Sequence, residues 1–345
     1  MKFGIMNLFP ADEGNDHQIV RETLEEIQIA DDLGYDSCWL AEHHFSRYGI
    51  LGNPLMLGTA IAERTKTITI GTAVLVLPLH DPIRVAEDAA MLDVLSNGRL
   101  QVGVGRGYQP QEFRGFGVDR DRNKELYAET VDILKLAWTA DNWSYEGEHF
   151  RYTDMNVYPK PLTPGGPPIL HGTSSPDTFR RRGLAGDRII VSSSFTPMQR
   201  TKENYDSYRS ALAEARHPVS GFELPFMQQV WAGESRDGLQ TAAQAALTYY
   251  QSVGKVIPGS DEARESEREY YEKVQRNINL LTVERTLTHG GNFGSVDQVV
   301  DTIGRIQTEL GVNHYIGWFH IPSLDRRLAI ESMETFAAKV IPQFS

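Results

Sequence analysis

The sequence lacks the features that mark several common classes of protein. Its 345 residues include a single cysteine, Cys38, so no disulfide can form within the chain and no cysteine cluster can bind a metal. No apolar stretch is long enough to cross a membrane, and the first residues form a strand pattern, not a signal peptide. Acidic residues outnumber basic ones by 46 to 34, which disfavours binding to nucleic acid or an anionic membrane. We expect a cytoplasmic protein.

Three catalytic signatures are absent as well. The stretch Gly103–Tyr108 is not a dinucleotide fingerprint, because Tyr108 occupies the place of the third glycine of G-x-G-x-x-G. The chain has no Gly-x-Ser-x-Gly elbow, which disfavours a serine hydrolase, and no His-Glu-x-x-His. The neighbours His43 and His44 point to opposite faces of an extended segment and therefore chelate poorly. We expect no catalytic metal.

Short apolar strands alternate with amphipathic helices along the chain, a pattern typical of an all-parallel α/β fold. Eight such units favour a TIM (β/α)8 barrel over a doubly wound sheet, which is the alternative. Residues 141–168 break the pattern and are predicted to form a hairpin and a loop. Residues 235–291 form a polar insertion after the seventh strand, and we expect them to act as a mobile lid. The predicted strands cover 3–9, 37–41, 68–77, 100–104, 169–171, 187–191, 225–232 and 314–319.

Polar side chains cluster directly after these strands. They are Glu42, His43, His44, Arg106, Thr173, Ser174, Ser192, Ser193, Ser194 and His320. In a barrel the carboxyl ends of the strands share one face, and active sites lie there.

Arg106 and the Thr173-Ser174 turn are the candidate anion site. A guanidinium at the end of a buried strand needs an anion or a solvated cleft. The turn leads into a helix that starts at Pro176, whose first backbone amides attract anions. The two features predict a phosphate held from two sides. An internal salt bridge for Arg106 and a simple helix cap for Thr173-Ser174 are the alternatives.

His43 is compatible with three roles. Imidazole titrates near neutrality, so His43 is a candidate general base. A metal ligand, with His44 or His171 assisting, and a histidine satisfied by hydrogen bonds in the core remain open.

Several blocks of sequence, in order along nearly the whole chain, resemble one known family. They are Trp39-Leu40-Ala41-Glu42-His43-His44-Phe45, Gly52-Asn53-Pro54, Gly71-Thr72-Ala73-Val74, Leu77-Pro78, Asp81-Pro82, Arg106-Gly107, Glu112-Phe113-Arg114 and Val157-Tyr158-Pro159-Lys160. The family is that of the bacterial luciferases, which are flavin-dependent monooxygenases, and the resemblance is greatest to the luciferase α subunit.

The resemblance implies a TIM barrel that binds reduced FMN and reacts it with O2. It also implies that the hydroperoxyflavin formed in this way oxidises a small aldehyde- or ketone-like substrate. The family's cysteine near the flavin is Gly105 here, and its Leu-Tyr pair is Tyr108-Gln109, so light emission is not implied. The resemblance assigns catalysis to His43 and cofactor binding to Ala73 and Val74 (at a cis peptide bond), Arg106, Tyr108, Thr173, Ser174 and Ser192.

The resemblance also implies partners and leaves two alternatives. A separate flavin reductase would supply the cofactor, and a homodimer would form through the helices at 53–64 and 82–96. One alternative is a hydride-transfer enzyme on the same fold that uses the deazaflavin F420. The other is a non-catalytic partner subunit or flavin-storage protein, against which the presence of both His43 and Arg106 argues.

Overall fold

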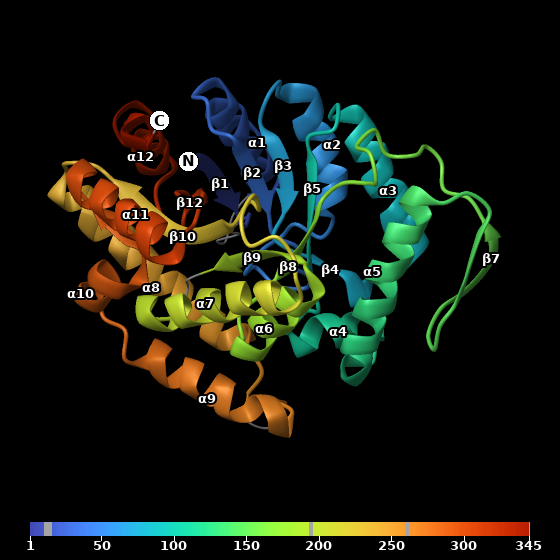
Figure 1. Cartoon of the computed structure of the whole chain (residues 1–345). Coiled ribbons are helices and arrows are strands. Elements are labelled where there is room, and N and C mark those ends of the chain that lie inside the picture. The colour runs from blue at the N-terminus through green and yellow to red at the C-terminus, as the bar shows by residue number, and fades with distance from the viewer. Residues whose placement is uncertain (10–15, 193–195, 260–261, 345) are drawn as a thin grey trace.

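In a computed structural model, which describes residues 1–9, 16–192, 196–259 and 262–344, eight parallel strands close into a barrel (Figure 1). β1 pairs with β2 and with β12, and the pairing of β9 with β10 completes the ring. The predicted TIM barrel is confirmed and the doubly wound sheet is excluded. The barrel strands are β1 (Lys2–Asn7), β2 (Ser37–Leu40), β3 (Thr69–Thr72), β5 (Leu100–Gly105), β8 (Ile169–Gly172), β9 (Arg188–Ser192), β10 (Pro225–Ala232) and β12 (His314–Trp318).

The helices surround the barrel and begin where the sequence supplies caps. Asn53 caps α2 by accepting a hydrogen bond from the Met56 amide, and Pro54 occupies the first helical position. Ser295 and Gln298 form a capping box at the start of α11. The helices are α1 (Asp16–Asp32), α2 (Pro54–Arg64), α3 (Pro82–Leu95), α4 (Pro110–Phe116), α5 (Asn123–Thr139), α6 (Pro176–Ala185), α7 (Met198–Glu214), α8 (Arg236–Val256), α9 (Glu265–Asn279), α10 (Val283–Arg285), α11 (Val296–Leu310) and α12 (Arg326–Thr335).

The structure departs from the predicted elements in four places. The strand predicted over 68–77 is divided into β3 and β4 (Leu75–Val76), and the Ala73–Val74 peptide bond between them is cis. The sequence predicts a long amphipathic helix over 119–138, and in the structure this helix begins at Asn123, after a short 3-10 turn. Helix α4 and the short strand β11 (Asn292–Gly294) were not predicted. The hairpin expected within 141–168 is present as β6 (Trp143–Glu146) and β7 (Arg151–Met155).

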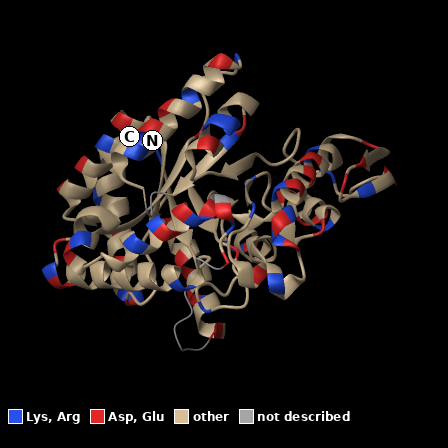
Figure 2. Cartoon of the chain, turned by 90° about the horizontal axis from the view of Figure 1, so that it is seen from below, with Lys and Arg blue, Asp and Glu red and all other residues tan. Residues whose placement is uncertain are grey.

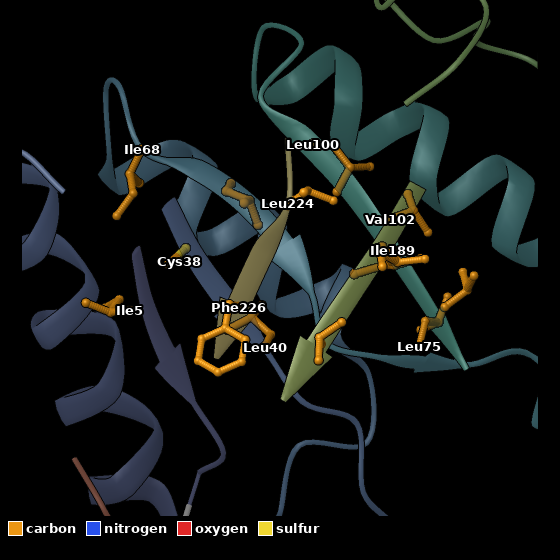
Figure 3. Packing of buried hydrophobic residues seen from close by; sticks show 14 of the residues in the cluster. Ile5, Cys38, Leu40, Ile68, Leu75, Leu100, Val102, Ile189, Leu224 and Phe226 are labelled. Carbon is orange, nitrogen blue, oxygen red and sulfur yellow. The ribbon is translucent and has the colours of Figure 1, made fainter. Parts of the chain in front are cut away.

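Two apolar layers hold the barrel together. Between strands and helices, Ile5, Val102, Ile189 and Phe226 pack in one cluster (Figure 3). Cys38 belongs to the same cluster, and burial raises the pKa of its thiol to about 12, so it is no nucleophile. Inside the barrel, the residues that point inward fill the lower levels and leave the carboxyl end of the strands open. They include Met6, Trp39, Leu170, Ile190 and Ile316.

The outer surface carries both signs of charge. Figure 2 shows Lys and Arg interspersed with Asp and Glu along the helices. Among the helices of the described residues, none combines the length and the apolar character needed to cross a membrane.

Candidate active site

A cavity of about 370 Å³ opens at the carboxyl ends of the barrel strands. Its lining includes all eight residues that the resemblance assigns to catalysis and cofactor binding, although they come from five separate segments of the chain. They are His43, Ala73, Val74, Arg106, Tyr108, Thr173, Ser174 and Ser192. Ser193 and Ser194, which also follow the sixth predicted strand, lie outside the described residues.

Small residues form one side of the cavity around Val74. A Cβ atom added to Gly105 would lie 2.4 Å from Val74 Cγ2, and one added to Gly172 would lie 3.0 Å from Val74 Cγ1. Glycine at both positions therefore makes room for the Val74 side chain. Ala41 and Ala73 also belong to the lining. The side chains on this side of the cavity are therefore short and apolar, which suits a planar ring.

The Arg106 guanidinium lies at one end of the cavity and forms no ion pair within the described part of the chain. Among the described residues, no carboxylate lies within ion-pair distance of it, so the internal salt bridge considered above is not found there. Burial, together with the nearby charge of Arg181, lowers the pKa of Arg106. The carboxylate of Glu267 lines the same cavity but is bound by Arg120 at 2.7 Å. This end of the site therefore has the charge to bind an anion.

The Thr173-Ser174 turn does not cap α6. The Thr173 hydroxyl donates to the backbone oxygen of His171 at 2.9 Å. The N-cap residue is Ser175, whose hydroxyl contacts that of Thr178 at 2.7 Å and makes no capping bond to the helix amides. The start of α6 therefore remains available to an anion beside Ser174.

His43 faces the cavity with one ring nitrogen and is held through the other. Its Nδ1 lies 2.9 Å from Nε2 of Gln109 and 3.3 Å from Oε1 of Glu112. Its ring forms a T-shaped contact with that of Tyr48, with 4.6 Å between ring centroids. The side chain is 11% exposed, which leaves the ring accessible from the cavity alone.

His44 points away from His43, as predicted for neighbours on an extended segment. Its Nε2 lies 2.8 Å from the buried Glu42 carboxylate, which also binds His80 at 2.8 Å and accepts a hydrogen bond from the Val76 amide. Burial by itself would raise the pKa of Glu42, but these hydrogen bonds outweigh burial and lower the pKa to about 2. These hydrogen bonds of Glu42 join the end of β2 to β4, directly beside the Ala73–Val74 peptide.

We expect Glu42→Gln to destabilise the protein in a pH-dependent way. A carboxyl whose pKa falls from 4.5 to about 2 on folding contributes about 3 kcal/mol above pH 4.5. That contribution is lost as the pH falls through the folded pKa of about 2. His80, whose pKa is raised, contributes in the opposite sense: its share is complete below pH 6.5 and is lost as the pH rises through its folded pKa.

Urea unfolding of both proteins between pH 4 and 8 measures this effect. The difference between wild type and Glu42→Gln should be greatest near pH 6 and shrink below pH 4.5. Glu309→Gln, which alters an exposed ion pair on α11, is the control and should change stability by less than about 1 kcal/mol. A gap between Glu42→Gln and wild type that is equally large at pH 4 would contradict the assignment.

Two histidines considered as candidates lie away from the cavity. His171 points outward from β8 to the Tyr127 hydroxyl, and burial lowers its pKa to about 4. His320 binds Glu26 of α1 at 3.0 Å. At the end of β12 the cavity is lined by Trp318 instead. Among the described residues, no three His, Cys, Asp or Glu side chains are grouped so as to hold a metal ion.

Several lining residues were not found from the sequence. Tyr249 of α8 reaches the cavity from the insertion, with its hydroxyl 2.6 Å from that of Tyr48 and its ring against Trp318. Met227 and Gln229 point inward at alternate positions of β10, which the period of two in that strand could have revealed. Nothing in the local sequence distinguishes Tyr249 from other helical residues.

The chain matches a family model described as luciferase-like monooxygenase over residues 1–314. It is 31% identical over 224 residues to an alkanal monooxygenase alpha chain from the Kryptophanaron alfredi symbiont, which covers 65% of this chain and 62% of that protein. It is 26% identical over 353 residues to the oxygenase component of the flavin-dependent trigonelline monooxygenase of Acinetobacter baylyi, covering 97% and 92%.

Solved structures share the fold over the whole length. The monooxygenase RslO1 of Streptomyces bottropensis has a TM-score of 0.85 at 23% identity, covering all of both chains. The oxygenating constituent of 3,6-diketocamphane monooxygenase of Pseudomonas putida, in complex with FMN, has a TM-score of 0.83 at 18% identity, covering 99% and 98%. An F420-dependent secondary alcohol dehydrogenase has a TM-score of 0.78 at 19% identity, covering 100% and 99%.

The matched family model spans all but the last 31 residues of the chain and includes every lining residue discussed above except Trp318. The protein therefore belongs to the luciferase-like family of flavin-dependent monooxygenases.

Proposed function

We propose that this chain is an oxygenase that uses reduced FMN and O2 to oxidise a small aldehyde- or ketone-like substrate. One observation carries the proposal: an arginine that forms no ion pair with the described residues, a surface of short apolar side chains and an accessible histidine share a single cavity. The arginine suits a phosphate, the apolar surface suits a planar ring, and the histidine suits a reacting oxygen.

The residues of the chain divide the work. Reduced FMN, when bound, supplies the electrons that activate O2. Arg106, Ser174 and the first turn of α6 hold its phosphate, and Val74 supports its ring. Tyr108, which follows β5, and Ser192, at the end of β9, would contact the cofactor from two other strand ends. His43 presents a proton to an oxygen atom in the cavity, and the enclosing walls exclude water.

Gln229 is proposed to bind the oxygen atom of the substrate. It stands across the cavity from the small residues around Val74, beside Met227 and Trp318. It is 2% exposed, and within the described part of the chain neither atom of its amide has a hydrogen-bond partner. A buried amide without a partner costs about 1–3 kcal/mol. A carbonyl oxygen of the substrate would accept from its Nε2 and recover part of that cost.

We expect Gln229→Met to stabilise the ligand-free protein by about 1 kcal/mol, because the variant removes an unsatisfied amide at similar volume. The neighbouring Gln228→Met is the matched control. Its Oε1 accepts a hydrogen bond from the Tyr315 hydroxyl at 3.3 Å, so that variant should destabilise instead. Urea unfolding without flavin gives both values. A loss of stability in Gln229→Met would show that the amide has a structural partner.

The oxygenase is proposed to work with a separate flavin reductase and as a homodimer. The trigonelline relative bears the name of an oxygenase component, which supports a two-component system here. The helices expected at a dimer interface, α2 and α3, expose apolar side chains: Met56 is 70% exposed, and Met91, Val94 and Leu95 are also exposed. Sedimentation velocity on the purified chain tests the dimer.

The insertion is proposed to contain a lid, with α9 as its moving part. In Figure 1, α9 lies at the edge of the molecule beyond α6 and α8, and its Glu267 and Tyr271 line the cavity. Helix α8 is instead packed into the core through Ala242, Ala246 and Tyr250. Ion pairs fasten the lid to the loop before α5: Arg120 binds Glu267 at 2.7 Å, and Arg264 binds Asp121 at 2.8 Å.

We expect Arg120→Ala to increase the fraction of O2 that is released as hydrogen peroxide without product, by roughly two- to tenfold, because an open cavity admits water. Peroxide and product are measured together after a single addition of reduced FMN. Arg151→Ala, which breaks an exposed pair in the β6–β7 hairpin, is the control. Equal peroxide yields in wild type and Arg120→Ala would rule out this lid.

The function itself is tested by anaerobic titration with reduced FMN, oxidised FMN and F420, followed by admission of air. We expect reduced FMN to bind most tightly. We also expect the bound flavin to reoxidise more slowly than free reduced FMN, because the cavity shields it. Binding of F420 alone would indicate hydride transfer. If no flavin binds, the chain is a partner subunit and the proposal fails.

A further inference from the structure

We infer that Gln109 is a positioning residue that decides which nitrogen of His43 carries the proton. It holds neutral His43 as an Nε2–H donor toward the cavity. That this proton is donated to a carbonyl-type oxygen of the substrate rests on the proposed function. The position of the proton on His43 does not depend on it.

Gln109 is held so that its amide nitrogen faces the imidazole. The residue is fully buried, directly before α4. Its Oε1 accepts a hydrogen bond from Nε2 of Gln111 at 3.2 Å, and its Nε2 lies 2.9 Å from Nδ1 of His43. An amide N–H only donates, so Nδ1 must accept. A neutral imidazole with an accepting Nδ1 carries its proton on Nε2.

Glu112 competes for the same nitrogen and requires the opposite tautomer. Its Oε1 lies 3.3 Å from Nδ1 and, as a carboxylate, only accepts, so this contact needs a proton on Nδ1. The contact is longer than that of Gln109, and the same oxygen already accepts from the His44 amide at 3.0 Å. In neutral His43, Nδ1 therefore accepts a hydrogen bond from Gln109. When the ring is protonated at both nitrogens, Nδ1 donates to Glu112 instead.

The other groups around the ring leave Nε2 to the cavity. The rings of Tyr48 and His43 form a T-shaped contact, and a Cβ atom added to Gly49 would lie 3.1 Å from Cδ2 of His43 and 3.3 Å from its Cβ. Among the described residues, none makes a hydrogen bond to Nε2. An Nε2–H cannot act as a base, but it can polarise an oxygen, as a neutral imidazole does when it faces a substrate carbonyl. His43 is therefore a hydrogen-bond donor to a carbonyl-type oxygen.

The test is NMR of the flavin-free protein labelled with 15N-histidine, in which nitrogen shifts and two-bond couplings report the tautomer of each ring. The His43 signals are those lost in His43→Ala. We expect the Nε2–H tautomer in wild type near pH 8. In Gln109→Met the ratio of Nε2–H to Nδ1–H should fall by about tenfold, the value of one hydrogen bond. Gln111→Met, which leaves the contact to His43 in place, should keep the Nε2–H tautomer.

A second variant protects the test against misfolding. Gln109→Glu keeps the side-chain volume but places an acceptor against Nδ1, so it should convert His43 to the Nδ1–H tautomer. An Nδ1–H tautomer in wild type overturns the inference, and so does an unchanged tautomer in both Gln109 variants. Because no flavin is present, failure here is distinguishable from failure to bind reduced FMN, which would overturn the proposed function instead.

Discussion

Arg106→Ala weakens the binding of reduced FMN by roughly 30- to 1000-fold, equivalent to about 2–4 kcal/mol. The guanidinium has no carboxylate partner among the described residues, and burial together with Arg181 lowers its pKa. A phosphate bound there removes an unfavourable concentration of positive charge, and this gain is lost with the arginine.

Two comparisons make the Arg106 experiment specific. Reduced riboflavin lacks the phosphate, so its affinity should be the same in wild type and Arg106→Ala. Arg327→Ala on the surface of α12, whose partner is Glu331, should bind reduced FMN as wild type does. Anaerobic fluorescence titration gives all the constants. Unchanged affinity of Arg106→Ala for reduced FMN would place the phosphate elsewhere.

The barrel could be predicted from the sequence because its strands are covered on both faces. Strands such as Arg188–Ser192 read as short apolar runs bounded by polar residues, and strong helix caps such as Asn53 and Ser295 mark the helices between strands. Strand β11 was not predicted, because it has three residues and depends on β10 for its pairing. Helix α4 was missed for a similar reason: it is one short element between two loops.

The candidate site was predicted where it depends on strand ends and missed where it depends on tertiary contacts. Arg106 and Thr173 follow barrel strands directly, so topology alone brings them to one face. Tyr249 reaches the cavity from the middle of a helix in the insertion, and no local pattern indicates this. His320 follows a strand as well, but one residue separates it from the end of β12. In that position its side chain binds Glu26 and faces away from the cavity.

His43→Ala is expected to retain the binding of reduced FMN within about twofold while lowering product formation by roughly 10²- to 10⁴-fold, the usual contribution of a positioned proton donor or acceptor. Flavin binding should persist, because the residues proposed to hold the phosphate and ring are Arg106, Ser174 and Val74, on other strand ends. Product per reduced FMN in a single turnover is the measurement, made with the substrate that a panel of aldehydes and ketones yields.

The control for His43→Ala must separate chemistry from folding. His289→Ala, at an exposed position of the short π-helix Thr286–Gly290 that follows α10, should leave product formation unchanged, and unfolding in urea should show that His43→Ala is as stable as wild type within about 1 kcal/mol. The alanine variant leaves Gln109 and Glu112 facing a water-sized gap, which water can fill because both groups are polar. If His43→Ala loses reduced FMN together with activity, His43 is a structural histidine of the flavin site. If it binds flavin and forms product at the wild-type rate, the proton comes from another group, and Tyr48 and Tyr249, whose hydroxyls meet 2.6 Å apart at the same wall, are the side chains placed to supply it.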